Sequence, residues 1–219
     1  FYNKPVFQPI VKTAYTMTEQ EGVIKFQLQF QQQTLLSAAD VAEISSWRTI
    51  MLQLGMLGQT PQRYDNYGFG NISQRYGDNH GFIISGTQTG GISHMTAADY
   101  ALVTQCQPAQ NRIVALGQTR PSSEAMTHGQ LYQLSADINF VIHAHCPQIW
   151  QPAGTLGLAQ TRAEVPYGTV AMAQEVARLA GTVLVEYAAA IRKLKDAKPP
   201  KDVADDITGQ LQRLMPKRF

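Results

Sequence analysis

Residues 138–145 read Ile-Asn-Phe-Val-Ile-His-Ala-His, an apolar run that ends in two histidines. Its bulky and β-branched residues predict a buried β-strand. Because alternate residues of a strand point to the same side, we expect His143 and His145 to present their imidazoles together. Two imidazoles placed in this way can chelate one divalent metal ion. The alternative is an ordinary hydrogen-bonded pair at the end of a strand.

Three segments upstream of the histidines offer hydrogen-bond donors at predicted turns. Residues 70–73 read Gly-Asn-Ile-Ser, residues 85–91 read Ser-Gly-Thr-Gln-Thr-Gly-Gly, and residues 121–124 read Pro-Ser-Ser-Glu at the start of a predicted helix. Unpaired backbone N–H groups at such turns and at a helix N-terminus attract anions. Taken alone, each of them is explained by turn geometry or helix capping. Their occurrence together favours a site for a phosphate or carboxylate group.

Short strand-like runs alternate with helical patterns along the chain. The strand-like runs lie at 24–30, 70–73, 81–85, 113–117 and 138–145. The helical patterns lie at 37–54, 97–103, 122–134, 147–154 and from 169 onward. In the first helix Ser37 is the expected cap, and the apolar stripe runs through Val41, Ile44, Trp47, Ile50, Met51 and Leu54. Strands interleaved with helices predict an α/β layered domain.

The chain has 219 residues, which suits one main domain. We expect an N-terminal arm and strand at 1–36, the α/β domain at 37–194, and a charged C-terminal tail at 195–219. The hydrophobic fraction of 44% is normal for a globular protein, so disorder of the whole chain is excluded. The charged fraction of 16% is low, which favours association of subunits.

Composition also restricts the partners of the chain. A net charge of +2 is far from the basic footprint of a nucleic-acid-binding protein. No apolar run reaches the roughly 18 to 20 residues needed to span a bilayer. Cys106 and Cys146 form no disulfide framework, and the first ten residues show no signal-peptide pattern. We therefore expect a soluble, cytoplasmic protein that binds neither nucleic acid nor membrane.

The motifs at 70–73, 84–90, 121–124 and 143–145, in this order and with this spacing, resemble those of the class II aldolase/adducin family. The similarity runs from about Trp47 to Val176. It implies a three-layer α/β domain with a central, mostly antiparallel sheet and helices on both faces. It also implies one divalent metal ion, with zinc the expected ion, and a homotetramer with sites at the subunit interfaces.

The resemblance assigns roles to individual residues. His143 and His145 match two metal ligands, and Glu124 matches a carboxylate that binds the metal or acts as general acid and base beside it. The pocket for the substrate's phosphate or an equivalent anion matches Asn71, Thr89, Gly90, Ser122 and Ser123. Thr87 is the alternative to Thr89, because the length of this loop differs from the family pattern. A catalytic tyrosine of the family has no alignable motif here, so Tyr187 receives no role.

The chain departs from the family at the third metal-ligating histidine, because no histidine follows His145. Where the family has a loop, a strand and that histidine, Leu179 is followed directly by Ala180. One interpretation is a segment missing between these two residues, which would carry the third ligand; this is the interpretation we favour. The other is one long helix, because apolar residues keep a three and four spacing from Met172 to Leu194.

Two further residues are secondary candidates. His128 lies one helical turn beyond Glu124 and either faces the site or is an ordinary helix histidine. Cys146 follows the histidine pair but points to the opposite side of the strand, so we expect a buried small residue there.

The resemblance favours a metal-dependent carbon–carbon lyase of the aldolase type. Its substrate would be a small phosphorylated or carboxylated sugar-like molecule, cleaved through a metal-stabilised enediolate, with Glu124 moving the proton. Epimerisation, dehydration or decarboxylation could use the same site. The alternative from another class is a non-catalytic, adducin-like interaction domain.

Overall fold

The structure is a computed structural model that describes residues 23–77, 81–166 and 168–181. All of them belong to one compact unit, Phe7–Gly181. Most of the predicted arm and the whole predicted tail at 195–219 lie outside the described residues.

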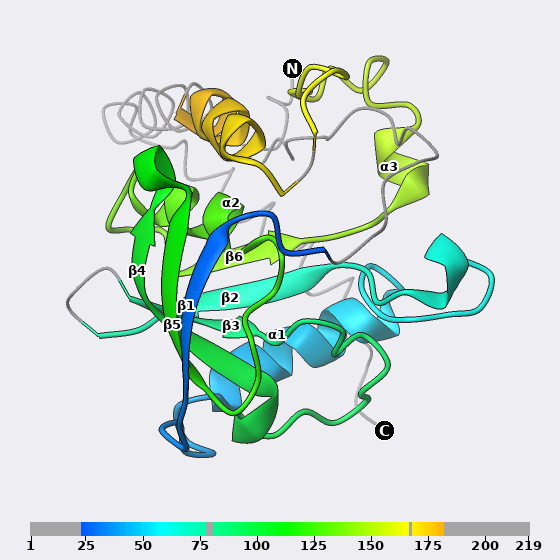
Figure 1. The fold of residues 1–219 in the computed structure, drawn as a ribbon. Helices are drawn as coiled ribbons and strands as arrows, with labels where there is room; N and C mark the ends of the chain where they lie inside the picture. The colour runs from blue at the N-terminus through cyan, green and yellow to red at the C-terminus, as the bar shows by residue number, and fades with distance from the viewer. Residues whose placement is uncertain (1–22, 78–80, 167, 182–219) are drawn as a thin grey trace, which may run out of the picture. The chain divides into compact units, whose positions relative to one another are not determined.

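A six-stranded sheet forms the centre of this unit (Figure 1). Its strands are β1 (Gln27–Gln32), β2 (Asn71–Arg75), β3 (Phe82–Ser85), β4 (Tyr100–Gln107), β5 (Arg112–Gly117) and β6 (Phe140–His143). They lie in the order β1-β5-β4-β3-β2-β6. Four neighbouring pairs are antiparallel, whereas β1 runs parallel to β5. The sheet is therefore mixed, and the strand of the predicted arm is part of it.

The helices of the described residues are α1 (Ala42–Gln53), α2 (Ala125–Tyr132), the short α3 (Pro147–Trp150) and a C-terminal helix seen from 170 to 181. Single 3₁₀ turns occur at η1 (Tyr64–Asn66), η2 (Ala97–Asp99) and η3 (Pro108–Gln110). No helix in these ranges combines the length and the apolar character that a membrane crossing requires.

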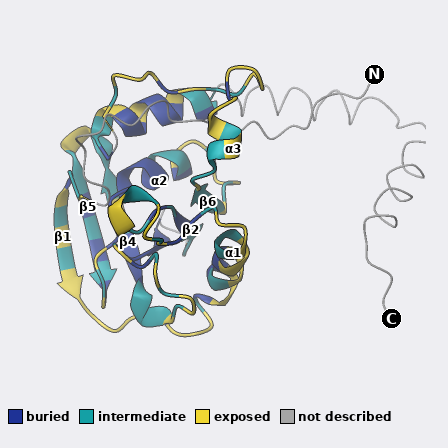
Figure 2. Ribbon diagram, turned by 90° about the vertical axis from the view of Figure 1, so that its right-hand side faces the viewer, coloured by how far each residue is buried: buried dark blue, intermediate teal, exposed yellow. Residues whose placement is uncertain are grey.

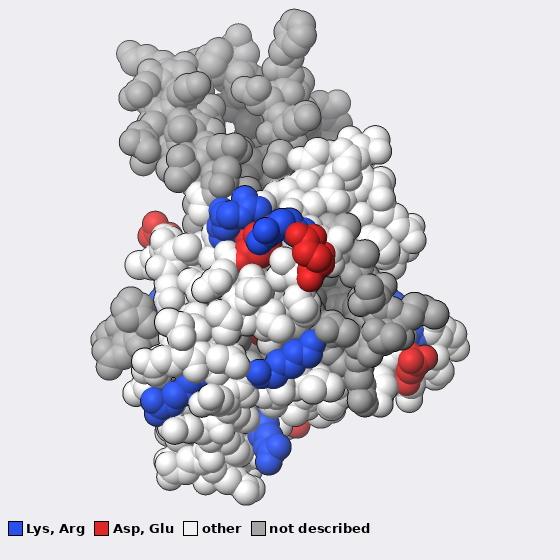
Figure 3. All heavy atoms as spheres, turned by 45° about the horizontal axis from the view of Figure 1, so that its top comes forward, with Lys and Arg blue, Asp and Glu red and all other residues white. Residues whose placement is uncertain are grey.

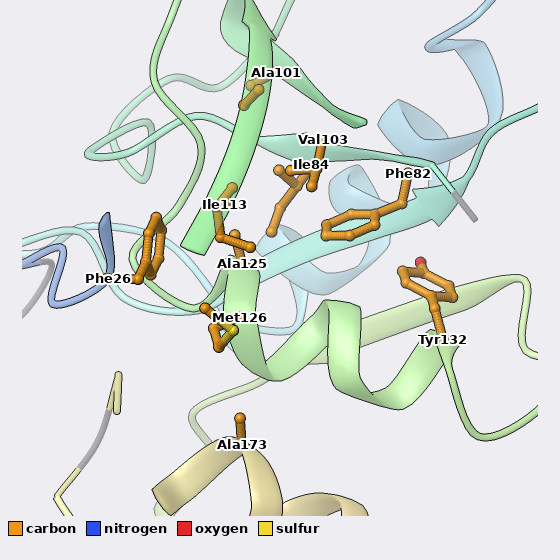
Figure 4. Close-up of a cluster of buried hydrophobic side chains, with 11 residues drawn as sticks. Phe26, Phe82, Ile84, Ala101, Val103, Ile113, Ala125, Met126, Tyr132 and Ala173 are labelled. Carbon is orange, nitrogen blue, oxygen red and sulfur yellow. The ribbon is translucent and has the colours of Figure 1, made fainter. Parts of the chain in front are cut away.

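Each face of the sheet carries its own hydrophobic cluster, because side chains alternate along every strand. Ile84 of β3 belongs to one cluster together with Met126 of α2 and Ala173 of the C-terminal helix (Figure 4). Its neighbour Ile83 belongs to the second cluster, which contains Ile44 of α1. Thus α1 and α2 lie against opposite faces. Burial is concentrated in the middle strands and α2, while β1 and α3 have no buried residue (Figure 2).

The predicted helix at 97–103 is wrong beyond its first turn. Only Ala97–Asp99 form a 3₁₀ turn, and the strand β4 begins at Tyr100. Tyr100 and Val103 are fully buried and pair with Ser85 and Phe82 of β3. The block Tyr-Ala-Leu-Val is buried on both faces of the sheet, so it lacks the alternation that marks a half-buried strand.

The strand that precedes the histidines is shorter and less buried than predicted. β6 covers only Phe140–His143, lies at the edge of the sheet beside β2, and is half-buried throughout. A strand with one neighbour and an open edge buries less surface than a central strand, although its sequence is equally apolar. The predicted helix at 147–154 is also reduced to the single turn of α3.

The first helix begins later than expected and is rotated. Ser37 bonds with Asp40 in a preceding turn, where its N–H donates to Oδ2 at 2.8 Å, and α1 starts at Ala42. Ile44 is buried as predicted, but Trp47, Ile50 and Leu54 of the expected stripe are 41%, 45% and 60% exposed. The helix instead turns Arg48 inward.

The C-terminal helix passes through Leu179 and Ala180 without interruption. The described part of the helix, to residue 181, follows the spacing on which the single-helix interpretation is based, and its continuation to Leu194 lies outside the described residues. The missing segment stays a prediction. The helix is attached to the preceding loop by Glu175, whose carboxylate accepts hydrogen bonds from Arg178 at 2.9 Å and from the Arg162 N–H at 3.3 Å. The guanidinium of Arg178 is the main cause that lowers the pKa of Glu175 to about 2.

Charged side chains are sparse among the described residues on the face shown in Figure 3. On the face shown in Figure 3, Lys and Arg residues are separated by uncharged surface, and some lie beside Asp or Glu. This face carries no continuous basic surface.

Candidate functional site

A pocket lies where β2, β3 and the start of α2 meet. Its lining contains glycines and side chains with hydroxyl or amide groups: Gly68, Gly70, Asn71, Gly86, Thr87, Gln88, Thr89, Gly90, Ser122 and Ser123. The structure therefore brings together all five residues predicted to hold an anion, and Thr87 lies beside Thr89 in the same lining. The four predicted side chains are between 6% and 9% exposed, so a group bound there would be largely shielded from water.

Two glycines allow the pocket to form because the backbone passes too closely for any side chain. A Cβ atom on Gly90 would lie 2.3 Å from the carbonyl oxygen of Gly58 and 2.8 Å from the Cα of Gly68. A Cβ atom on Gly70 would lie 2.9 Å from the carbonyl oxygen of His143, and its φ of +71° also favours glycine. The pocket thus depends on backbone packing as well as on its polar side chains.

Backbone hydrogen bonds join the two donor-rich segments of the pocket. The Ser122 N–H donates to the Ser85 carbonyl at 3.1 Å, and the Thr87 N–H donates to the Arg120 carbonyl at 2.9 Å. The Ile72 N–H donates to the Ser85 hydroxyl at 3.2 Å and so links β2 to the same place. These bonds hold the segments 85–91, 121–124 and 70–73 in one arrangement.

Arg48 lies outside the lining of the pocket and bonds to one of its loops, a contact that the sequence did not predict. Its side chain is 3% exposed, and its guanidinium donates to the Thr89 carbonyl at 2.9 Å. Burial lowers the pKa of Arg48, yet an arginine stays charged in proteins. A buried positive charge therefore adjoins the loop that lines the pocket. No signal in the sequence distinguishes Arg48 from a solvent-exposed arginine of an amphipathic helix.

Glu124 lies at the N-terminus of α2, next to the serines of the pocket. It is the N-cap residue and is 3% exposed. Its N–H donates to the Ser122 hydroxyl at 3.3 Å, and its carbonyl accepts from the His128 N–H at 3.1 Å. The positive end of the helix dipole favours a negative charge at this position.

His128 belongs to a buried hydrogen-bond network and not to the pocket. Its Nδ1 lies 2.7 Å from the Ser73 hydroxyl, which lies 2.8 Å from the Tyr132 hydroxyl. Burial is the main cause that raises the pKa of Tyr132. The network joins α2 to β2, so the structural role of His128 is to hold α2 against that strand.

His143 and His145 present their rings to each other, with centroids 4.7 Å apart. His143 ends β6, and its Nδ1 lies 3.1 Å from the amide nitrogen of Asn71 on β2. His145 lies beyond the strand, where its N–H donates to the Met56 carbonyl at 2.7 Å. The pair therefore adjoins the pocket through Asn71.

Aromatic rings and one arginine surround His145, an arrangement that no pattern in the sequence predicted. The Tyr64 and Phe69 rings lie 4.8 Å and 5.6 Å from the His145 ring. Arg63 donates to the His145 carbonyl at 3.0 Å and to the Gly55 carbonyl at 2.9 Å, while its guanidinium lies 3.9 Å from the Phe69 ring. The backbone of Tyr64, Asp65 and Asn66 is left-handed, with φ of 52°, 51° and 65°. This turn is held in an uncommon conformation beside the histidine.

The described residues contain no group of three His, Cys, Asp or Glu side chains placed to hold one metal ion. Glu124 is therefore not gathered with the two histidines into such a group. Cys146 is half-buried and not buried as expected, with its thiol 3.5 Å from the Gln148 side chain, because it lies beyond the end of β6.

Comparison with known proteins gives the same assignment as the motifs. A family described as "Class II Aldolase and Adducin N-terminal domain" matches residues 60–209. A methylthioribulose-1-phosphate dehydratase from Gluconacetobacter diazotrophicus is 37% identical over 90 residues. That match covers 38% of this chain and 40% of the dehydratase, so it spans well under half of either protein. Since the family match covers more than half of the chain and includes the pocket, Glu124 and both histidines, the chain belongs to the class II aldolase and adducin family.

Proposed function

We propose that this protein is a metal-dependent lyase of the aldolase type, acting on a small phosphorylated or carboxylated sugar-like substrate. The observation that carries the proposal is the convergence of the five predicted anion-binding residues on one pocket. Asn71 of that pocket is also within hydrogen-bond distance of His143. Asn71 would therefore belong to the anion site and also contact one of the two metal-ligating side chains.

The pocket would hold the phosphate or carboxylate of the substrate. Thr89, Ser122 and Ser123 provide hydroxyl groups, and Gly90 lets the backbone approach closely. The lining contains no charged side chain, so the buried guanidinium of Arg48 behind Thr89 supplies the nearby positive charge. Fixing the anion far from the reacting bond would orient the substrate and reduce its loss of freedom in the reaction.

His143 and His145 would hold the metal ion. Their adjacent rings fit two ligands of one divalent ion, and zinc in a catalytic site has three protein ligands and an open position. The pair thus accounts for two of the three. When bound, the ion supplies Lewis-acid stabilisation of the negative charge that develops on the substrate's oxygens.

Glu124 would transfer the proton. It is buried at the N-terminus of α2, and its own N–H donates to the Ser122 hydroxyl, so it adjoins the pocket in which the substrate would bind. A carboxylate in this position can take a proton from the substrate and return it after the bond breaks. Cleavage of a carbon–carbon bond is our first candidate reaction. Loss of water is the second, because the matching relative is named a dehydratase.

The proposal extends to the assembly. We propose three layers with helices on both faces of the sheet, and a cytoplasmic homotetramer that binds neither nucleic acid nor membrane. Support for association comes from the outer side of α1, where Trp47, Ile50 and Leu54 leave apolar surface exposed.

A non-catalytic, adducin-like interaction domain is the second candidate function. The observation that favours it is the lack of a third ligand beside the histidine pair in the described residues. Such a domain would keep the fold and the pocket without turnover.

The test is an assay of the metal-loaded protein over a panel of sugar phosphates and hydroxy-keto acids. Retro-aldol cleavage, loss of water, and exchange of the substrate's α-proton with solvent are followed separately. Glu124→Gln should lower the rate by about 10²–10⁴-fold with folding and metal content unchanged. Glu43→Gln, which changes an exposed carboxylate on α1, is the matched control. No turnover of any substrate by the wild type would favour the interaction domain.

A further inference from the structure

The side chain of Asn71 lies between the pocket and the histidine pair, and one of its two polar atoms has no partner. Its Nδ2 is 3.1 Å from Nδ1 of His143. Its Oδ1 is fully buried and has no hydrogen-bond partner among the described residues. Burying an acceptor without a partner costs about 1–3 kcal/mol, so this arrangement calls for an explanation.

The strands fix the two side chains as direct neighbours. Asn71 and His143 are opposite each other in the antiparallel pair β2 and β6. The close passage of Gly70 beneath the His143 carbonyl holds the same two strands together. The contact between amide and imidazole is therefore set by the backbone and not by the chance position of two flexible side chains.

The orientation of the amide determines which imidazole nitrogen carries the proton. With Nδ2 facing His143, Nδ1 must accept a hydrogen bond, the proton lies on Nε2, and the Asn71 oxygen stays unsatisfied. Rotation of the amide by half a turn exchanges its oxygen and nitrogen with almost no change in shape. Oδ1 then accepts a hydrogen bond from Nδ1–H, and Nε2 of His143 carries a lone pair.

The rotated amide also suits the pocket. Asn71 lines it, and a small shift of the lining would let an N–H of Nδ2 reach a bound anion from the position that the buried Oδ1 now holds. An anion accepts hydrogen bonds and cannot donate one, so it favours this orientation over the one that presents Oδ1.

We infer that Asn71 is a positioning residue that couples the two halves of the site. Its Oδ1 holds His143 as the Nδ1–H tautomer, which leaves Nε2 as the metal-ligating atom, and its Nδ2 donates to the anionic group of the substrate. A partner that fixes the tautomer of a ligating histidine commonly contributes 10- to 100-fold to metal affinity. The inference rests on the proposed function for its metal and its anion, but the tautomer exists in the protein alone.

Nitrogen NMR of the imidazole rings in the metal-free protein reads the tautomer directly when recorded at about pH 8, well above the ordinary imidazole pKa of about 6.5. The His143 signals are identified by their loss in His143→Gln. In the wild type Nδ1 should carry the proton, and inorganic phosphate should increase this preference. Asn71→Ala should remove the preference, whereas Asn71→Asp should keep it, since a carboxylate also accepts from Nδ1–H.

Affinities for zinc and for inorganic phosphate complete the test, measured separately. Asn71→Ala should weaken zinc binding by about 10- to 100-fold and also weaken phosphate binding. Asn71→Asp should retain zinc binding and lose phosphate binding, because it places a negative charge in the pocket. Ser123→Ala is the matched control: it should weaken phosphate binding with the His143 tautomer and zinc affinity unchanged.

The two possible failures are distinguishable. If the wild type carries the proton on Nε2 of His143, or if Asn71→Ala leaves the tautomer and zinc affinity unchanged, the inference is overturned whatever the activity. If the tautomer responds to Asn71 as described while no substrate is turned over, the inference stands and the proposed enzyme is contradicted.

Discussion

The pocket and the histidine pair are adjacent, yet the fold holds them in different ways. The pocket is enclosed by buried side chains, by backbone hydrogen bonds between three segments and by glycines at close contacts. The histidines lie at the end of a half-buried edge strand, where His143 is the last strand residue and His145 lies beyond it. All residues of the proposed anion site therefore line one pocket, whereas the proposed metal site has two candidate ligands among the described residues.

This difference indicates which half tolerates change. Residues of the pocket are constrained by packing. Substitutions there should therefore alter the shape of the pocket and its affinity for anions together. Residues around the histidines are constrained by a few contacts of Arg63, Tyr64 and Asn71. Substitutions of Arg63 or Tyr64 should change metal affinity and leave the pocket intact, whereas Asn71 belongs to both halves. The predictions that follow test this separation.

Gly90→Ala should have the largest effect. The new methyl group would meet the Gly58 carbonyl at 2.3 Å, and backbone atoms on both sides prevent an easy shift. We expect a loss of stability of about 1–3 kcal/mol and loss of phosphate binding, measured by urea unfolding and by calorimetric titration. Gly91→Ala is the control, because its methyl group meets the flexible end of Gln59. Equal effects of the two changes would contradict the close-contact argument.

Arg48→Met should weaken phosphate binding without a comparable effect on zinc. It removes the buried charge and the hydrogen bond to Thr89 while filling a similar volume. We expect phosphate affinity to fall about tenfold, equivalent to about 1.4 kcal/mol. Arg48→Lys keeps the charge and should retain part of the affinity. If Arg48→Met binds phosphate as tightly as the wild type, the positive charge has no role in the pocket.

Arg63→Ala should weaken zinc binding without a comparable effect on phosphate binding. It removes the hydrogen bonds to Gly55 and His145 and the packing on Phe69, so His145 is held less firmly. We expect zinc affinity to fall about tenfold, with phosphate affinity unchanged. A parallel loss of both affinities would show that the two halves are not separable.

The sequence predicted the pocket more accurately than the histidine side for a physical reason. Gly70 and Gly90 stand where the backbone leaves no room for a side chain, so their residue types carry the information even though the atoms they meet are distant in the chain. The contact of Arg63 with His145 joins residues 82 positions apart and leaves no local pattern. The inward turn of Arg48 depends in the same way on packing against a distant loop.

The helices and strands of the fold were predicted only in part. The helix α2 and the strand β3 lie within the predicted segments, since glycines and polar residues mark their ends. The strands β2 and β5 overlap their predicted segments, but β2 continues to Arg75 and β5 begins at Arg112. The strand β4 was mistaken for a helix because a strand buried on both faces shows no alternation. The edge position of β6 and the parallel pairing of β1 follow from the order of the strands, which periodicity does not encode.

The most direct test of the account is the metal content of the purified full chain, compared with that of the His143→Ala, His145→Ala double variant. We predict about one divalent ion per subunit in the wild type and none in the double variant, with phosphate binding retained in both. Folding is checked by unfolding in urea. Equal metal content in the two proteins would contradict the proposed metal site.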